Sequence, residues 1–213
     1  MRGVYRKPSK ALLAYRKTRR LGKHADILGA ARREFIEKGF PAAVVSTIAR
    51  EANASTATVY KYFGSKEDLF RAALVSTCHQ VEEFSVPHDA SLDALDAIQA
   101  YVAAYFDLCD EIGGAALLRM LAAEALYAPR ITSRLDKALT VAGESGLADR
   151  IEELMRAGAL PPLEAGKAAG QIICLVRGHL IWPGILNARF VRPKRAARII
   201  GEAIRTSIPS LNK

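Results

Sequence analysis

Cysteine and histidine are scarce in this sequence, and their spacing excludes the sites that these residues usually build. Three cysteines, far apart and odd in number, do not make a disulfide framework, and they lack the spacing of zinc ligands. No two of the four histidines lie four positions apart, as the histidines of a helical zinc site do: His24, His79, His88 and His179. We therefore expect no metal and no cofactor, and we interpret the cysteines as reduced, inert thiols rather than redox sensors: Cys78, Cys109 and Cys174.

Long uninterrupted apolar stretches are also missing. A helix needs about 18–20 apolar residues to cross a bilayer, and no run in the sequence approaches that length. The basic N-terminus is followed by only a short apolar stretch, Ala11 to Tyr15, which is too short for the core of a signal peptide. Half of the 213 residues are apolar and a quarter are charged, so the chain can bury an ordinary globular core without disulfides. These features predict a cytoplasmic protein with no membrane partner.

Acidic residues are absent from the first 25 positions, which carry nine lysines and arginines. The chain has a formal net charge of +9, and its other 22 lysines and arginines equal the 22 aspartates and glutamates in number, so the excess lies at the N-terminus. This distribution excludes a uniformly basic, histone-like protein. Residues 1–23 are either a disordered, solvated tail or an arm that binds a polyanion. If it is an arm, DNA is the preferred partner, through its phosphates or its minor groove, and a membrane surface is the second candidate.

Helical periodicity dominates the rest of the chain, without a convincing strand pattern, internal repeat or low-complexity segment. Gly39, Asn53 and Gly64 are placed to end helices in left-handed conformations, and Ser55 is placed to cap the next helix. The sequence therefore predicts an all-α protein of about nine helices, over residues 24–38, 45–51, 56–62, 65–81, 92–112, 115–127, 131–157 (bent near Gly143 and Gly146), 163–186 and 194–207.

The first helices have the arrangement of a helix-turn-helix. Residues 45–51 and 56–62 are two short helices joined by a tight break and braced by a longer helix before them. Apolar side chains from these helices can form a small core: Ile27, Phe35, Phe40, Val45, Ile48, Val59 and Phe63. That core lets the third helix enter a DNA major groove. Its outward side chains suit close approach to bases and hydrogen bonds to phosphates, and they include Thr56, Thr58, Lys61 and Tyr62.

Residues 24–71 resemble the DNA-binding domain of the TetR family of transcriptional repressors. The resemblance rests on fixed spacings: Ile27-Leu28-x-Ala30-Ala31-x-x-x-Phe35-x-x-x-Gly39-Phe40, then Ile48-Ala49-x-x-Ala52, then Ser55-x-x-Thr58-Val59-Tyr60-x-Tyr62-Phe63-x-Ser65-Lys66-Glu67-x-Leu69. Two positions depart from the family pattern. Ala43 replaces the usual Thr or Ser cap, which removes about 1 kcal/mol of helix stability. Asn53 replaces the usual turn glycine, but Asn tolerates the left-handed conformation, so we expect the turn to be kept.

The resemblance assigns DNA contacts residue by residue. The family's base-reading residues correspond to Thr56, Ala57 and Thr58, and the cap residue before them, Ser55, is a further DNA-binding candidate. The family's phosphate-contacting residues correspond to Tyr60, Lys61, Tyr62 and Lys66. Packing in the core is the alternative for Tyr60, and a solvated surface charge is the alternative for the two lysines.

For residues 72–213, the resemblance implies a helical domain for ligand binding and dimerisation. Family members are homodimers in which the last two long helices of each subunit form a four-helix bundle, here residues 163–186 and 194–207. Both helices carry apolar stripes, which fit either a core or a partner-facing surface. For Glu124, pairing with an arginine or facing solvent is an equal alternative to a ligand contact. The candidates for contact with an unknown small-molecule inducer are Tyr105, Arg119, Met120, Glu124, Tyr127, His179 and Trp182.

The sequence lacks the motifs of common enzyme active sites, such as a nucleophile elbow or a phosphate-binding glycine loop. We expect a TetR-like repressor that binds a palindromic double-stranded DNA operator as a homodimer and leaves it when an inducer binds. The alternative is a nucleoid- or membrane-associated protein that binds DNA without sequence preference and without an inducer. A tight, specific operator complex would distinguish the first from the second.

Overall fold

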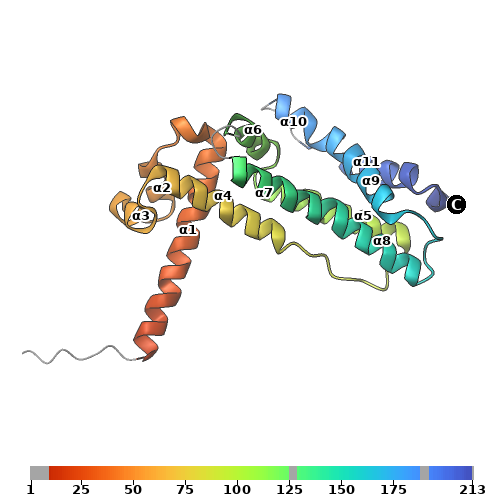
Figure 1. The fold of residues 1–213 in the computed structure, drawn as a ribbon, viewed down its shortest axis with the longest axis horizontal. Helices are drawn as coiled ribbons and strands as arrows, with labels where there is room; N and C mark the ends of the chain where they lie inside the picture. Colours follow the sequence, from red (N-terminus) through yellow and green to blue (C-terminus); the bar gives the residue numbers. More distant parts are fainter. Residues whose placement is uncertain (1–9, 125–128, 188–191, 213) are drawn as a thin grey trace, which may run out of the picture. The chain divides into compact units, whose positions relative to one another are not determined.

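The computed structural model describes residues 10–124, 129–187 and 192–212, and these residues are mostly helical, with no strand among them (Figure 1). The all-α fold class predicted from the sequence is confirmed. The chain divides after Ala73 into two compact units. The predicted DNA-binding domain ended at residue 71, close to this division, and the assignment of one function to each unit stays a prediction.

The first unit consists of α1 (Lys10–Ala42), α2 (Val45–Glu51), α3 (Thr56–Phe63) and the first turns of α4 (Lys66–Glu82). The bounds of α2 and α3 agree with the prediction to within one residue. The predicted start of the first helix at residue 24 is wrong, because α1 includes residues 10–23 of the expected arm; residues 1–9 of the arm lie outside the described residues. Alanine, leucine, lysine and arginine make up most of that stretch, and all four favour the helix.

Two glycines of this unit have the predicted left-handed conformation, but only Gly64 ends its helix, and the predicted end of the first helix at residue 38 is wrong. Gly39 has a φ of 75° and kinks α1, which makes one more turn to Ala42. Gly64 has a φ of 78°, and its N–H donates to the Tyr60 carbonyl at 2.8 Å. Residues with a side chain rarely adopt this conformation, so these two glycines fix where α1 bends and where α3 ends.

Apolar side chains from all four helices form the core of the first unit. Six of the seven predicted core residues are buried and Phe40 is half-buried. Phe70 of α4 joins them, and its ring centroid lies 5.0 Å from those of Phe35 and Phe40. Burial of each such side chain contributes about 1.5–3 kcal/mol, so this core holds α2 and α3 in place.

The second unit continues from the end of α4 through α5 (Ala94–Glu111), α6 (Gly114–Glu124), α7 (Pro129–Thr140), a π-helical turn (Val141–Ser145), α8 (Gly146–Arg156), α9 (Ala165–Leu180), α10 (Trp182–Leu186), α11 (Ala196–Ser207) and a final 3₁₀ turn (Pro209–Asn212). In Figure 1, α7 and α8 form one rod that runs beside α5, and α9 lies beside α11. The α5 helix contacts α6, α8 and α11, so it lies at the centre of this unit.

The turn at Val141–Ser145 lies where the sequence predicted a bend. Two glycines there face tyrosines of α5. A Cβ at Gly143 would lie 2.8 Å from the Tyr105 ring, and a Cβ at Gly146 would lie 2.0 Å from Tyr101 Oη. The missing side chains make room for both tyrosines, and the π-helical turn is the local adjustment that accompanies this close approach.

The prediction of one continuous helix over 163–186 is wrong. The α9 helix ends at Leu180, and α10 begins at Trp182 after a break of one residue. Pro183 explains the break, because it has no N–H to donate and its ring would clash with the carbonyl four residues earlier.

The sequence-based statement that no apolar run approaches membrane-spanning length also needs correction. By length and composition, Ala165–Leu186 is apolar enough to cross a bilayer. Its apolar residues Ile172, Ile173 and Val176 are buried, and α9 packs against α8 and α11. This packing is typical of the core helix of a globular domain.

Candidate DNA-binding surface and ligand cavity

The N-terminus of α3 is closed by its predicted cap. Ser55 Oγ accepts a hydrogen bond from the Thr58 backbone N–H at 3.1 Å, and the hydroxyl oxygens of Ser55 and Thr58 lie 2.8 Å apart. Such a cap contributes about 1 kcal/mol to helix stability. Because both hydroxyls take part, the Thr58 side chain is held in one orientation at the start of the helix.

The predicted DNA-contacting residues of α3 differ in exposure. Ala57, Tyr60 and Lys61 are exposed, whereas Thr56 and Thr58 are half-buried. Tyr60 is 44% exposed, so packing in the core does not describe this residue. Phe63, expected in the core, is buried. One side of the helix is therefore open to a partner along its length.

Tyr62 contributes to packing as well as to this surface. It is half-buried, and its ring centroid lies 5.9 Å from that of His24 on α1 in an edge-on arrangement. His24 also lies 4.9 Å from the buried Phe63 ring. These ring contacts join α1 to α3, and a phosphate contact from Tyr62 stays a prediction.

The turn between α2 and α3 depends on a lysine that the sequence placed in the N-terminal arm. Asn53 has a φ of 49°, the left-handed conformation expected of it. Lys23 Nζ donates to the Ala52 carbonyl at 3.1 Å and to the Asn53 carbonyl at 3.3 Å. Lys23 therefore stabilises the turn, a role that needs the folded structure to be recognised, because these residues lie about 30 positions apart.

The missing cap of α2 is compensated from α1. The residue before α2 is Val44, which offers no side-chain cap, but its N–H donates to Glu34 Oε1 at 3.0 Å. Glu34 is only 6% exposed, and a buried carboxylate near a helix N-terminus is stabilised by the helix dipole. The predicted cap position, Ala43, is therefore wrong by one residue, and the contact with Glu34 makes up for part of the stability that a capping side chain at Val44 would add.

Lys66 is held within the first unit. Its Nζ donates to the Pro41 carbonyl at 3.1 Å and lies 5.0 Å from the centroid of the Phe40 ring. One of its three N–H groups is therefore used near the end of α1, and two are left for a phosphate.

A cavity of about 270 Å³ lies within the second unit. Two of the predicted ligand residues line it, Tyr105 and Trp182. Ten further residues share the wall: Cys109, Ile112, Gly114, Leu117, Leu118, Asp136, Leu139, Arg177, Ile181 and Ile185. The wall is mostly apolar with a few polar groups, which is typical of a site for a small organic molecule.

Arg177 is the cation on the cavity wall, and the sequence analysis missed it. Its Nη2 donates to Tyr105 Oη at 2.6 Å, while its distances to the Leu139 carbonyl and to Glu144 Oε1 are both 3.4 Å. Its side chain is 30% exposed. Tyr105 Oη in turn donates to the Leu139 carbonyl at 3.2 Å. The polar end of the cavity is therefore a short network that joins α5, α7, α9 and the π-helical turn.

Burial controls the protonation of two groups on this wall. It raises the pKa of the Tyr105 hydroxyl well above its ordinary value, so this hydroxyl stays protonated. It also raises the pKa of the Cys109 thiol to about 11, so Cys109 is an unreactive thiol at neutral pH. Neither group supplies a negative charge to the cavity.

Three other predicted ligand residues, Arg119, Met120 and His179, lie outside the cavity wall. The Arg119 guanidinium donates to the Gly184 carbonyl and lines a separate hollow, and Met120 is buried outside the cavity wall. His179 is exposed and hydrogen-bonded to the Leu175 carbonyl. The side chain of Glu124 and all of Tyr127 lie outside the described residues.

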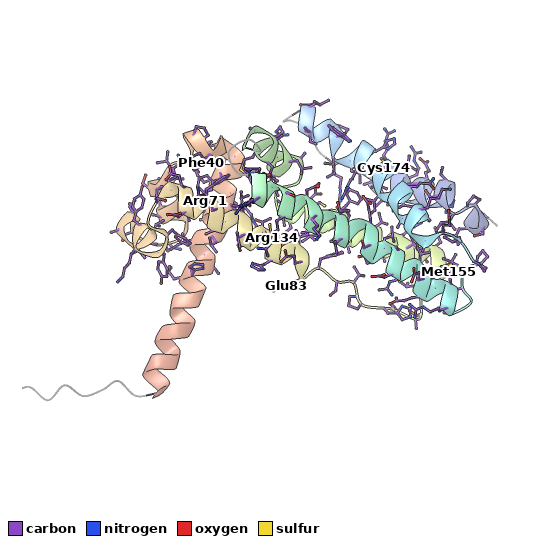
Figure 2. All side chains as sticks on the ribbon, in the orientation of Figure 1. Phe40, Arg71, Glu83, Arg134, Met155 and Cys174 are labelled. Atoms are coloured by element: carbon purple, nitrogen blue, oxygen red, sulfur yellow. The ribbon has the colours of Figure 1, made fainter. Side chains whose placement is uncertain are left out.

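The outer face of α9 and α11 combines exposed apolar and charged residues. Cys174 on α9, labelled in Figure 2, is exposed, and Leu175 is 39% exposed. A hollow between the two helices is lined by Leu175, His179, Arg195, Arg198, Ile199, Glu202, Ala203 and Thr206. This face of the two predicted dimerisation helices is open in the single chain.

An ion pair joins the end of α4 to α7. Arg134, labelled in Figure 2, donates from Nε and Nη2 to the two carboxylate oxygens of Glu82 at 2.9 and 2.8 Å. This bidentate contact holds the pKa of Glu82 below its ordinary value. The α4 helix starts in the first unit and ends in the second, so this pair fixes the end of α4 to α7 within the second unit.

Known family models match both units of the chain. Residues 27–73 match the model of bacterial regulatory proteins of the tetR family. Residues 96–208, more than half of the chain, match the C-terminal domain of AefR-like transcriptional repressors.

Individual proteins show the same similarity. The transcriptional regulator HbdR of Aromatoleum sp. (strain CIB) is 37% identical over 57 residues, which are 27% of this chain and only 25% of HbdR. A TetR-family regulator from Mesorhizobium loti has a TM-score of 0.69 and 22% identity, over 88% of this chain and 96% of that one. The flavonoid-responsive regulator FrrA has a TM-score of 0.60 and 27% identity, over the same shares of the two chains.

Proposed function

This chain belongs to the TetR family of transcriptional regulators, and from that premise we propose that it is a cytoplasmic repressor that binds a palindromic operator as a homodimer and is released by a small molecule. The observation that carries the proposal is the open side of α3, held by the Ser55 cap and by the core of the first unit. Recognition of a major groove needs a helix with a fixed orientation and accessible side chains, as in a helix-turn-helix.

Two groups of residues divide the DNA contacts in this proposal. Thr56, Ala57 and Thr58, beside Ser55, read base edges, because short side chains at the start of the helix allow close approach. The phosphate contacts come from Tyr60, Lys61, Tyr62 and Lys66, which position the helix without reading sequence.

Dimerisation places two copies of α3 on one operator. The open face of α9 and α11, within residues 163–186 and 194–207, pairs with the same face of a second copy. Two-fold dimers are the commonest oligomers, and two reading helices on DNA must lie one helical turn apart, about 34–36 Å, or a multiple of it.

Release follows from ligand binding in the cavity of the second unit. Tyr105 and Arg177 on the cavity wall both approach the carbonyl of Leu139 on α7, and Arg134 of α7 holds Glu82 of α4. A ligand that changes this network changes how α4 is held, and α4 leads to the DNA-binding helices. FrrA is described as flavonoid-responsive, which supports a small-molecule response in this fold. By reciprocity, operator DNA weakens ligand binding by the same factor.

Binding to selected DNA tests the repressor proposal. An operator is first selected from random duplexes, and we expect a Kd of about 10⁻⁸ M or tighter at physiological salt. Thr58→Ala should relax the preference between operator and mutated operators, since one good base contact contributes about 1–3 kcal/mol of discrimination. Lys61→Ala is the matched control, because it should weaken binding to every sequence and lower the salt dependence.

The result that overturns the proposal is a steep salt dependence with equal affinity for all sequences, which is the behaviour of a nucleoid- or membrane-associated DNA-binding protein. Equal loss on every sequence for Thr58→Ala would remove the base-reading role from that residue alone.

The dimer is tested separately by charge substitution on the open face. Leu175→Arg should give a monomer with much weaker operator affinity, whereas Val141→Arg, at another exposed apolar position, should leave the dimer intact. Sedimentation measures the oligomeric state of both variants, and a binding titration measures their affinity for the operator. A Leu175→Arg monomer with full operator affinity would refute the dimer proposal.

A further inference from the structure

We propose that the cavity of the second unit selects a small organic acid, with its carboxylate paired to Arg177 and its apolar body, of about one substituted ring, against the surrounding aliphatic wall. This inference rests on the proposed inducer function, because it names the chemical class of the molecule that the cavity takes.

The volume of the cavity limits the size of the ligand. An apolar cavity of about 150 Å³ accommodates benzene, and pockets for drug-sized ligands start near 300 Å³. At about 270 Å³ this cavity holds a ring, or a short chain of similar volume, with one substituent. A molecule with several fused or linked rings would extend beyond this volume.

The aliphatic residues of the cavity wall favour a ligand whose body is mostly apolar. Six aliphatic side chains line the cavity: Ile112, Leu117, Leu118, Leu139, Ile181 and Ile185. Water gains few hydrogen bonds against such a wall, so replacing it with hydrocarbon is favourable. The cationic group of the wall lies at the end of the cavity where Tyr105 and Arg177 meet.

Charge at that end favours an anion. Arg177 makes one short hydrogen bond, to Tyr105, and its ion pair with Glu144 is long at 3.4 Å. A ligand carboxylate could pair with the guanidinium at hydrogen-bond distance, and such charge-assisted contacts are the strong ones. Asp136 on the same wall is exposed, so water weakens its repulsion of an anion more than it weakens the attraction of the half-buried Arg177.

The same contact connects the ligand to the rest of the unit. Arg177 approaches Glu144 in the π-helical turn and the Leu139 carbonyl at the end of α7. A carboxylate that draws the guanidinium away weakens both long contacts at once. A neutral ligand in the apolar part of the cavity leaves them unchanged, so it lacks the differential interaction that a conformational response needs.

The chain contains its own probe of this cavity, because its single tryptophan, Trp182, lies on the wall. Full-length protein is titrated with 4-methylbenzoate and 3-phenylpropionate, with the two corresponding amides, and with 3-phenylpropylamine as a matched cation. Trp182 fluorescence reports binding. We expect the acids to bind at least about tenfold more tightly than the amides or the amine, as a charge-assisted hydrogen bond implies.

Variants at both ends of the ion pair test the assignment in opposite directions. Arg177→Met should weaken the acids about tenfold and leave the amides unchanged, while Glu144→Gln, which removes the competing carboxylate, should tighten the acids. Arg119→Met is the control, because Arg119 lies outside the cavity wall. Circular dichroism melts confirm that each variant is folded.

Operator release by the same compounds separates this inference from the proposed function. Acids that bind through Arg177 but leave the operator complex intact would keep the ligand class and refute the inducer function. Release by the amides or the amine, or equal affinity for all three classes, would refute the ligand class and leave the inducer function standing. If no compound perturbs Trp182, the ligand class is wrong.

Discussion

The close contact between Gly146 and Tyr101 predicts a large effect of the smallest possible substitution. In Gly146→Ala, the added Cβ would lie 2.0 Å from Tyr101 Oη, far inside van der Waals contact. The backbone itself accepts alanine, since φ is −65° and ψ is −32°. Tyr101 cannot move freely, because its hydroxyl donates to the Ala142 carbonyl at 2.8 Å and its ring packs edge-on against Phe84 at 5.7 Å.

Three contributions set the magnitude of this effect. Overpacking a closed site costs about 1–3 kcal/mol, and displacing the buried hydroxyl from its acceptor costs about 1 kcal/mol. Replacing glycine by alanine in a helix, by contrast, stabilises the helix by up to about 1 kcal/mol. We therefore expect Gly146→Ala to lower the free energy of unfolding by about 2 kcal/mol, which corresponds to a fall in Tm of roughly 4–8 °C for a chain of this size.

The assay is urea and thermal unfolding followed by circular dichroism, at one protomer concentration because a dimer's stability depends on concentration. Gly166→Ala is the matched control. Gly166 is an exposed helical glycine whose added Cβ would meet no atom within 4 Å, so this variant should be neutral or slightly stabilised.

A double-mutant cycle checks the cause. Tyr101→Phe alone removes the hydrogen bond to Ala142 and should cost about 1 kcal/mol. Combined with Gly146→Ala, it also removes the 2.0 Å contact and leaves the ring carbon Cζ at 3.1 Å, so the double variant should be more stable than the sum of the two effects by about 1 kcal/mol. Additive effects, or a Gly146→Ala protein as stable as the Gly166→Ala control, would refute the steric explanation.

Three further predictions follow from particular contacts. Lys23→Met should lower the free energy of unfolding by about 1 kcal/mol in urea denaturation, because two turn carbonyls lose their donor; unchanged stability would contradict its role. Cys174 should react with a thiol reagent in the Leu175→Arg monomer but be protected in the dimer, while Cys109 stays unreactive in both; equal Cys174 rates would contradict its place in the interface. Arg134 lowers the folded-state pKa of Glu82, so the contribution of Glu82 to stability is present above its unfolded pKa of about 4.3 and is lost as the pH falls through the folded value. The stability difference between the parent protein and Glu82→Gln, measured by unfolding from pH 8 to pH 3, should therefore disappear at the acid end, and a difference independent of pH would contradict the ion pair.

The DNA-binding helices could be predicted closely because their determinants are local in sequence. Ser55 caps α3, Gly64 ends it, and Asn53 takes the left-handed turn, each within a few residues of the structure it controls. The start of α1 and the break after Leu180 were predicted wrongly although their determinants are local as well. In the first case the charged stretch was interpreted as a possible tail, although most of its residues favour the helix. In the second case Pro183 interrupts the helix although the apolar pattern continues past it.

The cavity could be predicted only in part, because its polar end joins residues from distant helices. Tyr105 and Arg177 lie 72 positions apart and meet at 2.6 Å. Sequence patterns identified aromatic and polar residues within each helix, but they did not reveal which of them face the same space. Arg119 illustrates the difference: its residue type suited a ligand contact, yet it binds the carbonyl of Gly184 outside the cavity wall.

The two lysines assigned to phosphate contacts carry the same charge but differ in what DNA binding requires of them. Lys61 is exposed, so its side chain loses rotamer freedom when a phosphate binds, a loss of up to about 2 kcal/mol. Lys66 is already held by the Pro41 carbonyl and the Phe40 ring, so much of its rotamer freedom is lost on folding. A phosphate contact with Lys66 therefore contributes more net binding free energy than one with Lys61. Removal of Lys66 also removes its contacts at the end of α1, so a weakened complex would combine a lost phosphate contact with a less stable DNA-binding unit. Lys61 has no such second role, and its substitution therefore reports the electrostatic part of DNA binding more directly.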